Sequence, residues 1–436
     1  MAETEVGRTV RIGFLGCGTV GAAAVRMITE HASELADRTG ARVEIARIAV
    51  RDLSVDRHLD VPSEVWTSEP SEVIHGEDID VVVELMGGLD PARSLIADAL
   101  RGGKHVVTAN KELLASAGSE LMDAAEAGNS DLLFEGAVCG GIPIIRPMKE
   151  SLAGDRVRRV MGIMNGTTNF ILTRMSEVGG SFEESLAEAS RLGYAEADPS
   201  ADVDGHDAAS KLAILASLAF HGRVVAADVK REGISGVTAE DIAAAHDLGY
   251  EVKLLAVAEK AGGKVSARVH PAMIPKTHPL AAVRDVFNAV FVEGEQVGEL
   301  MFFGRGAGGS PTASAVVGDI VEIARNMQSG ARAIGSSYLK EAAAMEKPES
   351  VSVRYYVVLS VADQPGVLAG VAGVFAEHGV SIASLRQEGR GDHASLVLIT
   401  HTSSEGAHAA TFEGLRKLAA VKEIASKMRV EGATEE

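Results

Sequence analysis

Residues 10–28 read V-R-I-G-F-L-G-C-G-T-V-G-A-A-A-V-R-M-I, and this stretch decides the fold of the first part of the chain. The apolar run Val10–Leu15 predicts a buried strand, and Ala22–Ile28 predicts a helix. Between them stands G-x-G-x-x-G, from Gly16 to Gly21. In a strand-turn-helix setting this pattern is typical of a turn that binds the pyrophosphate of a dinucleotide.

Each glycine of this turn has a separate physical task. Gly16 permits the tight turn, Gly18 lets the pyrophosphate approach the backbone, and Gly21 lets the helix pack closely on the strand. The N-terminus of the helix then faces the phosphates. The candidate cofactor contacts here are Gly16, Gly18, Thr19, Val20 and Gly21.

The composition restricts the class of protein. A chain of 436 residues is too long for one ordinary core, so we expect two or three domains, and 46% hydrophobic with only 4% aromatic residues favours α/β cores. A net charge of −19 argues against nucleic acid as a partner. Two cysteines exclude a disulfide framework. No apolar run is long enough for a membrane span and no signal-peptide core is visible, so we expect a cytoplasmic protein.

The second expected strand, Val43–Val50, ends in Arg51, with Asp52 one residue later. An acid at the end of this strand is typical of NAD sites, whereas an arginine can bind the 2′-phosphate of NADP. We therefore expect NADP, with NAD possible. A solvated arginine after a strand is the alternative interpretation of Arg51.

Lys111 follows another expected strand, His105–Val107, within the sequence Thr108-Ala109-Asn110-Lys111-Glu112. Ligands of open α/β sheets bind outside the carboxyl ends of the strands. Lys111 is thus expected beside both nicotinamide and substrate, although a surface lysine after a strand is common.

Two later segments are rich in small or polar residues. Glu135–Pro143 could turn backbone carbonyls and the Glu135 carboxylate toward a hard cation, or could simply cross between domains. Asn165–Asn169 is expected to be a polar loop before a helix near Phe170, where threonine or asparagine can also act only as a cap.

Residues 196–211, E-A-D-P-S-A-D-V-D-G-H-D-A-A-S-K, lead into the apolar run L-A-I-L-A-S-L-A-F, which predicts a buried helix. Asp207 and Lys211 are four residues apart and should share one helix face. Such a lysine can be a positioned proton donor. Favourable interaction of acids with the helix dipole is the structural alternative.

From Val351 the pattern changes to β-α-β-β-α-β. Strands are expected at 353–361, 380–386, 394–400 and 421–430, with helices at 368–377 and 407–418. Strands are also expected at 224–230, 251–259, 265–269 and 287–292, and a helix at 310–327.

Together these motifs resemble the homoserine dehydrogenases. The matching pieces are Gly16–Gly21, Thr108–Lys111, Asn165–Asn169, Leu192–Pro199 running on to Asp204–Asp207 and Lys211, Gly304–Gly308 and Pro311–Val317. Many relatives carry proline where Arg305 stands. The tail, with Asp363-Gln364-Pro365-Gly366-Val367-Leu368 and His378-Gly379-Val380-Ser381-Ile382, resembles an ACT domain.

The resemblance implies reversible, NAD(P)-dependent reduction of L-aspartate 4-semialdehyde to L-homoserine, a step toward threonine, methionine and isoleucine. It implies catalytic roles for Lys111 and Lys211 at the reacting oxygen. Substrate contacts are implied for Glu196, Asp207, Lys111, Asn165, Gly166 and Thr167. Arg51, Lys111 and Gly304 join the cofactor set, and a monovalent cation, usually sodium, is implied at Glu135, Val138, Gly140 and Ile142.

The expected fold is therefore α/β in three domains. Residues 1–140 form an NADP-binding Rossmann domain, completed by a helix near 310–330. Residues 141–330 form an α+β substrate-binding and dimerisation domain, and 331–350 a linker. Residues 351–432 form a ferredoxin-like ACT domain. A homodimer or homotetramer is expected, with an amino-acid effector, threonine, at the ACT domain.

Three other interpretations stay open from the sequence. An aspartate dehydrogenase would share the nucleotide turn but lacks the segment from Glu196 to Lys211. A non-catalytic nucleotide sensor would not need Lys111 and Lys211. The ACT domain could serve dimerisation without binding any ligand.

Overall fold

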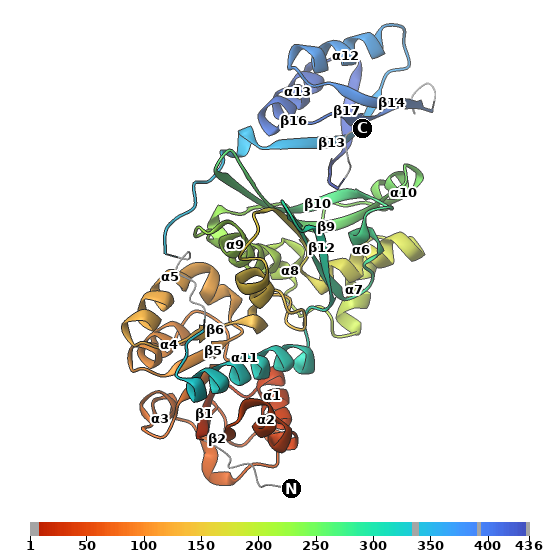
Figure 1. The fold of residues 1–436 in the computed structure, drawn as a ribbon. Helices are drawn as coiled ribbons and strands as arrows, with labels where there is room; N and C mark the ends of the chain where they lie inside the picture. The colour runs from red at the N-terminus through yellow and green to blue at the C-terminus, as the bar shows by residue number, and fades with distance from the viewer. Residues whose placement is uncertain (1–7, 334–339, 390–393, 433–436) are drawn as a thin grey trace. The chain divides into compact units, whose positions relative to one another are not determined.

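The computed structural model describes residues 8–333, 340–389 and 394–432 (Figure 1). The chain separates into two compact units. The first combines residues 1–166, 207–229 and 287–343, and the second combines residues 167–206, 230–286 and 344–436. No helix within the described ranges is both long and apolar enough to cross a membrane.

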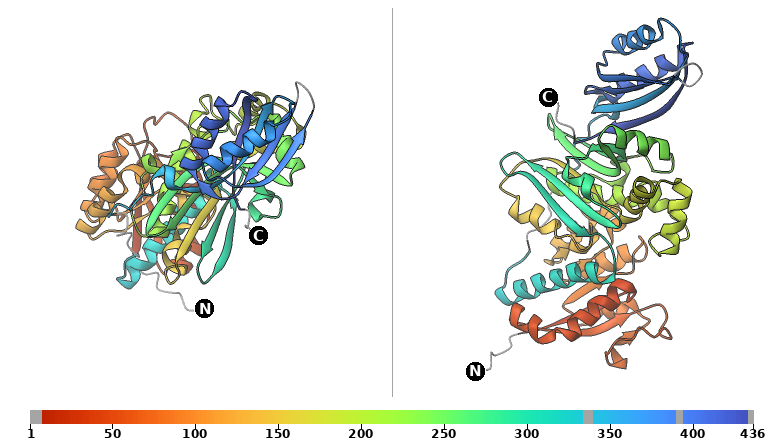
Figure 2. Two further views of the ribbon diagram at one scale, coloured as in Figure 1. Left: turned by 90° about the horizontal axis from the view of Figure 1, so that it is seen from above. Right: turned by 90° about the vertical axis from the view of Figure 1, so that its right-hand side faces the viewer.

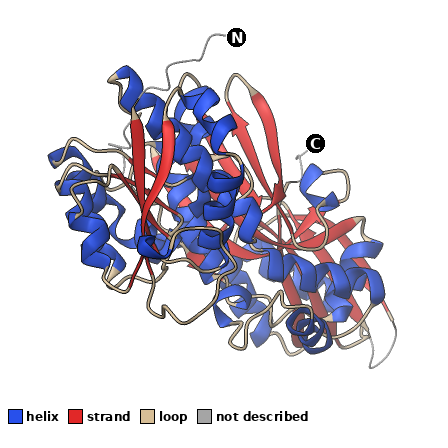
Figure 3. Cartoon of the chain, turned by 90° about the horizontal axis from the view of Figure 1, so that it is seen from below, coloured by secondary structure: helices blue, strands red, loops and turns tan. Residues whose placement is uncertain are grey.

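A six-stranded parallel sheet forms the core of the first unit. Its strand order is β3-β2-β1-β4-β5-β6, which is the order of a doubly wound dinucleotide-binding fold. Helices and strands alternate along this part of the chain, and Figure 3 distinguishes the two by colour. The predicted Rossmann fold is confirmed. The strands are β1 (Thr9–Leu15), β2 (Arg42–Ala49), β3 (Trp66–Thr67), β4 (Val81–Glu84), β5 (His105–Thr108) and β6 (Leu132–Leu133).

The helices of this sheet bury their apolar faces against it. Helix α11 (Gly309–Ser329) contributes Ala313, Val316 and Ile320 to the same core as Ile12 and Phe14 of β1. A late segment of the chain therefore stabilises the first sheet. The other helices are α1 (Thr19–Glu30), α2 (Ala32–Thr39), α3 (Pro70–His75), α4 (Ala92–Arg101) and α5 (Lys111–Ala127).

The first unit also holds three antiparallel strands and one buried helix. Strand β11 (Phe287–Gly294) pairs with β7 (Val157–Ile163) on one side and with β12 (Gly298–Arg305) on the other. Strand β12 was not predicted from the sequence, because its side chains are mostly exposed or half-buried and show no clean alternation. Helix α9 (His206–Phe220) is buried from Leu212 to Phe220, as predicted.

The second unit contains α6 (Gly166–Val178), α7 (Phe182–Arg191), α8 (Ser200–Val203), α10 (Ala239–Asp247) and the long hairpin of β9 (Tyr250–Ala261) and β10 (Lys264–Pro275). Two predictions were wrong here. Helix α6 begins at Gly166, so Thr167–Asn169 lie in its first turn and not in a loop.

The strand predicted at 224–230 is the second wrong prediction. A 3-10 turn, Ala226–Asp228, replaces it because the Asp228 carboxylate accepts the N–H of Val225. Only the short strand β8 (Lys230–Arg231) follows.

The C-terminal segment has the predicted β-α-β-β-α-β order (Figures 1 and 2, blue). Its sheet order is β17-β13-β15-β14, the ferredoxin-like arrangement, and a single apolar core joins the sheet to both helices. The ACT prediction is confirmed. The elements are β13 (Ser352–Val361), α12 (Val367–Glu377), β14 (Ile382–Glu388), β15 (Ser395–Thr400), α13 (Glu405–Lys417) and β17 (Val421–Val430), with a two-residue strand β16 (Ser403–Ser404) that pairs with β13 before α13.

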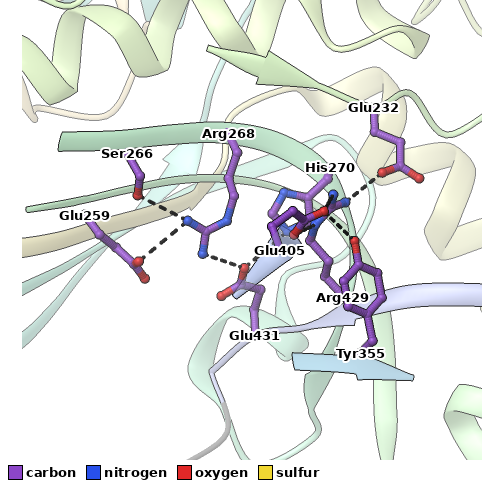
Figure 4. A network of polar contacts seen from close by, with 9 residues as sticks. All are labelled: Glu232, Glu259, Ser266, Arg268, His270, Tyr355, Glu405, Arg429 and Glu431. Carbon is purple, nitrogen blue, oxygen red and sulfur yellow. Dashed lines mark hydrogen bonds and ion pairs between the residues drawn. The ribbon is translucent and has the colours of Figure 1, made fainter. Parts of the chain in front are cut away.

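Strand β17 also pairs with β10 in parallel, with Ala272 opposite Arg429 and Met273 opposite Val430. Charged side chains accompany this pairing (Figure 4). Glu431, 6% exposed, accepts Arg268 Nη2 at 3.1 Å and lies 3.2 Å from His270 Nε2. We call these three residues the β10–β17 charge cluster.

Arg429 extends the contacts around that pairing. Its guanidinium binds the Glu405 carboxylate and the Glu232 carboxylate, each at 2.7 Å (Figure 4). The Tyr355 hydroxyl donates to Glu405, also at 2.7 Å. The ACT sheet is thus joined to the β9–β10 hairpin by backbone pairing and by buried charge.

Burial lowers the pKa of His270 to about 4, with Arg429 and Arg268 acting in the same direction and Glu431 opposing. An unfolded histidine takes up its proton near pH 6.5. The contribution of neutral His270 to the free energy of unfolding is therefore full above pH 6.5 and is lost as the pH falls toward 4.

Between pH 7 and pH 5, the free energy of unfolding of His270→Gln should fall by about 2 kcal/mol less than that of the parent chain, as measured by urea unfolding. The exposed His246→Gln serves as the control, and equal pH dependence of all three proteins would contradict this assignment.

Candidate active site and nucleotide-binding turn

The glycine-rich turn has the geometry that its sequence predicts. Gly16 has φ +94°, and a Cβ there would lie 2.9 Å from the Leu85 carbonyl. A Cβ at Gly21 would lie 2.8 Å from the Gly16 oxygen, whereas a Cβ at Gly18 would meet nothing within 4 Å. The turn therefore excludes side chains where backbones touch and stays open where a pyrophosphate would approach.

Thr19 and Val20 begin helix α1, with Gly18 as its N-cap, so their N–H groups lie at the helix start. Arg51 is exposed beyond the end of β2. Arg57, which the sequence analysis did not single out, donates from Nε to the Cys17 carbonyl at 3.0 Å. That contact fastens the glycine-rich turn to a loop that carries no recognisable motif.

Lys111 is the first residue of α5, directly beyond β5. Its position is set by Asn110, whose side-chain oxygen caps the helix by accepting the Leu113 N–H at 3.1 Å. The lysine thus stands at the carboxyl edge of the parallel sheet, where the sequence placed it.

Helix α9 brings the second lysine to the same point. Lys211 Nζ lies 2.7 Å from Asp207 Oδ2, and Lys111 Nζ lies 3.3 Å from Asp207 Oδ1. Asn165 donates to Asp207 Oδ2 at 2.9 Å, and the Met164 carbonyl accepts from Lys211 at 2.8 Å. Four predicted site residues therefore form one cluster, the two-lysine cluster: Lys111, Asn165, Asp207 and Lys211.

The electrostatics of the cluster depend on Asp207, whose side chain is 11% exposed. Burial alone would raise the pKa of its carboxyl. The ammonium groups of Lys211 and Lys111, with hydrogen bonds from Lys211 and Asn165, outweigh burial and lower that pKa to about 2. Asp207 is therefore a fixed anion at neutral pH, and one lysine contacts each oxygen of its carboxylate.

Other predicted residues lie outside this cluster. Glu196 is exposed in the second unit, between α7 and α8. Thr167 donates its hydroxyl to the Tyr194 carbonyl at 2.9 Å, and Gly166 opens helix α6. Gly304 lies on β12 opposite Asn288.

The segment predicted for a cation is buried at Glu135, Val138, Gly140 and Ile142. The Glu135 carboxylate accepts the N–H groups of Ile144, Ile145 and Arg146 at 2.6–2.9 Å. The side chain is thus committed to the backbone, so a cation here would be held by main-chain oxygens. Across the described residues, no group of three or more His, Cys, Asp and Glu side chains could hold a metal ion.

Glu84 was not singled out by the sequence analysis. It is fully buried at the end of β4 and accepts two backbone N–H groups and the Thr108 hydroxyl. The one sequence feature that could have indicated a role for Glu84 was an acidic residue at the end of an otherwise apolar strand.

Comparison with known proteins agrees with these features. Residues 143–321 match the family model described as homoserine dehydrogenase. Residues 16–135 match the homoserine dehydrogenase NAD-binding domain, and residues 355–417 match the ACT domain.

Whole-chain relatives extend the match. The homoserine dehydrogenase of Corynebacterium glutamicum is 51% identical over 98% of this chain and 96% of its own length. The crystal structure of a homoserine dehydrogenase from Thiobacillus denitrificans superposes with a TM-score of 0.92 at 39% identity, covering 98% of this chain and 99% of that one. A hyperthermophilic archaeal homoserine dehydrogenase mutant in complex with NADPH has a TM-score of 0.62 at 31% identity and covers 72% of this chain and 97% of its own. The chain therefore belongs to the homoserine dehydrogenase family, NAD(P)-dependent oxidoreductases, and carries a C-terminal ACT domain.

Proposed function

We propose that the chain interconverts L-homoserine and L-aspartate 4-semialdehyde, within the biosynthesis of threonine, methionine and isoleucine. The observation that carries the proposal is the meeting of Lys111 and Lys211 on Asp207 at the carboxyl edge of a dinucleotide-binding sheet. Reduction of an aldehyde puts negative charge on its oxygen, and two ammonium groups stabilise that charge where it develops.

Lys211 is the proton donor in this scheme, because it is the more buried lysine and is fixed by both Asp207 and the Met164 carbonyl. Lys111 shares the oxygen and orients it. Asp207 and Glu196 are the proposed contacts of the amino-acid part of the substrate, with Glu196 binding its amino group. Asn165, Gly166 and Thr167 are further proposed substrate contacts. When bound, the nicotinamide supplies or accepts the hydride.

NADP is the proposed cofactor, with NAD possible. Support comes from Arg51, exposed after β2 where a 2′-phosphate would lie, and from the NADPH complex of the archaeal relative. Gly304 and Lys111 complete the proposed cofactor contacts with the glycine-rich turn.

Arg51→Ala is expected to raise KM for NADP by about 10- to 150-fold and to leave KM for NAD within about twofold, because a charge-assisted phosphate contact contributes about 1.5–3 kcal/mol. Initial rates with both cofactors measure this. Arg42→Ala, at the opposite end of the same strand, should change neither value. A parallel rise for both cofactors would contradict a 2′-phosphate contact.

A monovalent cation, sodium, is proposed at the main-chain oxygens of Glu135, Val138, Gly140 and Ile142. The support is a buried, oxygen-rich segment whose one carboxylate is already used to hold the backbone in shape. In this role Glu135 shapes the segment and does not itself reach the ion with its side chain.

Threonine is the proposed effector of the ACT domain, residues 351–432. Residues 331–350 are proposed as its linker, of which 334–339 lie outside the described residues. Support comes from the β10–β17 pairing and its charge cluster, which connect the ACT sheet to the hairpin of the other domain.

A cytoplasmic homodimer or homotetramer, paired through residues 141–330, is also proposed.

One assay tests the function. The purified chain is mixed with L-homoserine and NADP or NAD, and absorbance of the reduced cofactor is followed with and without threonine. Reduction of cofactor with homoserine, but not with L-aspartate, is the expected result. Oxidation of L-aspartate alone would replace this proposal with an aspartate dehydrogenase, and a reaction insensitive to threonine would remove the effector.

A further inference from the structure

Glu84 is the last residue of β4 and lies directly opposite Thr108, the last residue of β5. Its side chain is 0% exposed. Oε1 accepts the Met86 and Gly87 N–H groups at 2.8 and 3.0 Å, and Oε2 accepts the Thr108 hydroxyl at 2.7 Å. Within the described part of the chain, the carboxylate has no ion-pair partner, so these three donors compensate its burial.

The donors belong to two loops at the same edge of the sheet. The Thr108 oxygen accepts the Asn110 N–H at 3.0 Å, and the Asn110 amide donates to the Gly88 carbonyl at 2.7 Å. Gly87 and Gly88 both have positive φ, so their loop is a sharp turn that needs such fixed partners. Glu84 therefore binds one loop directly and the other through Thr108.

The loop that contains Thr108 and Asn110 determines the position of Lys111. Asn110 both belongs to the Glu84 network and caps helix α5, whose first residue is Lys111. A charge-assisted hydrogen bond is shorter and stronger than a neutral one, so the carboxylate fixes Thr108 and Asn110 more firmly than an amide would. An error of about 1 Å in the position of a reacting group costs on the order of a hundredfold in rate.

We propose that Glu84 is a positioning residue, which places the Lys111 ammonium against Asp207 through Thr108 and Asn110. The proposal rests on the proposed function for its kinetic consequences, but not for its structural ones. The structural consequence is that Lys111 leaves Asp207 and becomes more accessible when Glu84 is neutralised.

The test uses the full chain and two kinds of variant. Glu84→Gln keeps the shape and removes the charge, and Thr108→Val removes the hydroxyl while Thr108→Ser keeps it. Glu84→Gln and Thr108→Val should each lower kcat/KM for homoserine at least about tenfold. Thr108→Ser should stay within about threefold of the parent chain. The double variant Glu84→Gln/Thr108→Val should have a kcat/KM no more than about twofold below that of the less active single variant. The two substitutions break the same hydrogen-bond network, so their effects should not add.

A substrate-free measurement separates this proposal from the proposed function. Acetic anhydride labelling, quantified by mass spectrometry, should acetylate Lys111 several-fold faster in Glu84→Gln, with the rate at the surface residue Lys347 unchanged. Glu112→Gln, which removes an exposed acid beside Lys111, is the matched control and should alter neither labelling nor kcat/KM.

Unchanged Lys111 labelling in Glu84→Gln would overturn the proposal, whether or not activity falls, since the lysine would then not depend on Glu84. Faster labelling without any homoserine oxidation by the parent chain would uphold the positioning role and refute the proposed reaction instead.

Discussion

Lys211→Ala should lower homoserine oxidation by about 10²–10⁴-fold, the range over which a positioned acid-base group contributes to rate. NADP binding should stay within about twofold, because the glycine-rich turn is formed by Gly16–Gly21 and not by α9. The lysine is 7% exposed and donates to Asp207 and to the Met164 carbonyl, so alanine leaves this buried position without a proton donor. Steady-state rates and fluorescence titration of NADPH measure the two quantities.

Loss of Lys211 also leaves Asp207 buried beside one cation fewer. Removing one partner of a buried ion pair costs about 3–5 kcal/mol, so the single variant can lose activity by unfolding. Lys211→Met/Asp207→Asn removes both charges at nearly constant volume and should recover stability but not turnover. Recovery of turnover together with stability would show that Lys211 serves the fold and not the proton transfer.

Glu431→Ala should destabilise the chain by about 3–5 kcal/mol, because it leaves Arg268 and His270 without their buried carboxylate. The side chain of Arg268 is only 9% exposed, and its remaining acid, Glu259, lies at 3.6 Å. Urea-induced unfolding followed by circular dichroism measures the loss. Glu423→Ala removes an exposed acid from β17, the strand that Glu431 directly follows, and should change stability by less than about 0.5 kcal/mol.

Equal stability of Glu431→Ala and the parent chain would mean that the β10–β17 charge cluster is solvated.

The same cluster changes what is expected of a chain cut before residue 351. From the sequence such a chain should keep its activity, yet the structure shows that it would lose β17 as a strand partner of β10 and Glu431 as a partner of Arg268. A stable truncation should therefore require Arg268 to be replaced by an uncharged residue.

Short sequence patterns were enough to predict the glycine-rich turn, the contact of Asp207 with Lys211 and the order of elements in the ACT domain. The glycine pattern predicted the turn correctly: Gly16 has a positive φ and a close approach to Leu85, Gly21 lies close to the Gly16 oxygen, and Gly18 stays open. Asp207 and Lys211 are four residues apart, which is about one helical turn, so their contact was predictable from the spacing. The ACT order was readable because each of its elements shows its own periodicity.

Local pattern misled where a nearby side chain competed for the backbone. Residues 224–230 are apolar enough for a strand, but Asp228 captures the Val225 N–H and closes a turn. At Glu135 only the role of the carboxylate changes: it accepts the N–H groups of Ile144, Ile145 and Arg146, and the cation site at this segment stays a prediction that rests on main-chain oxygens.

The sequence by itself determined the nucleotide turn, the alternation of strands and helices, and the pairing of Asp207 with Lys211, since these depend on residues within one or two turns of each other. Only the tertiary structure decided that Lys111 shares Asp207, that Glu84 joins two loops, and that β17 pairs with β10. Such contacts join residues far apart in the chain, and strand order and packing select them from many pairings that the same local patterns allow.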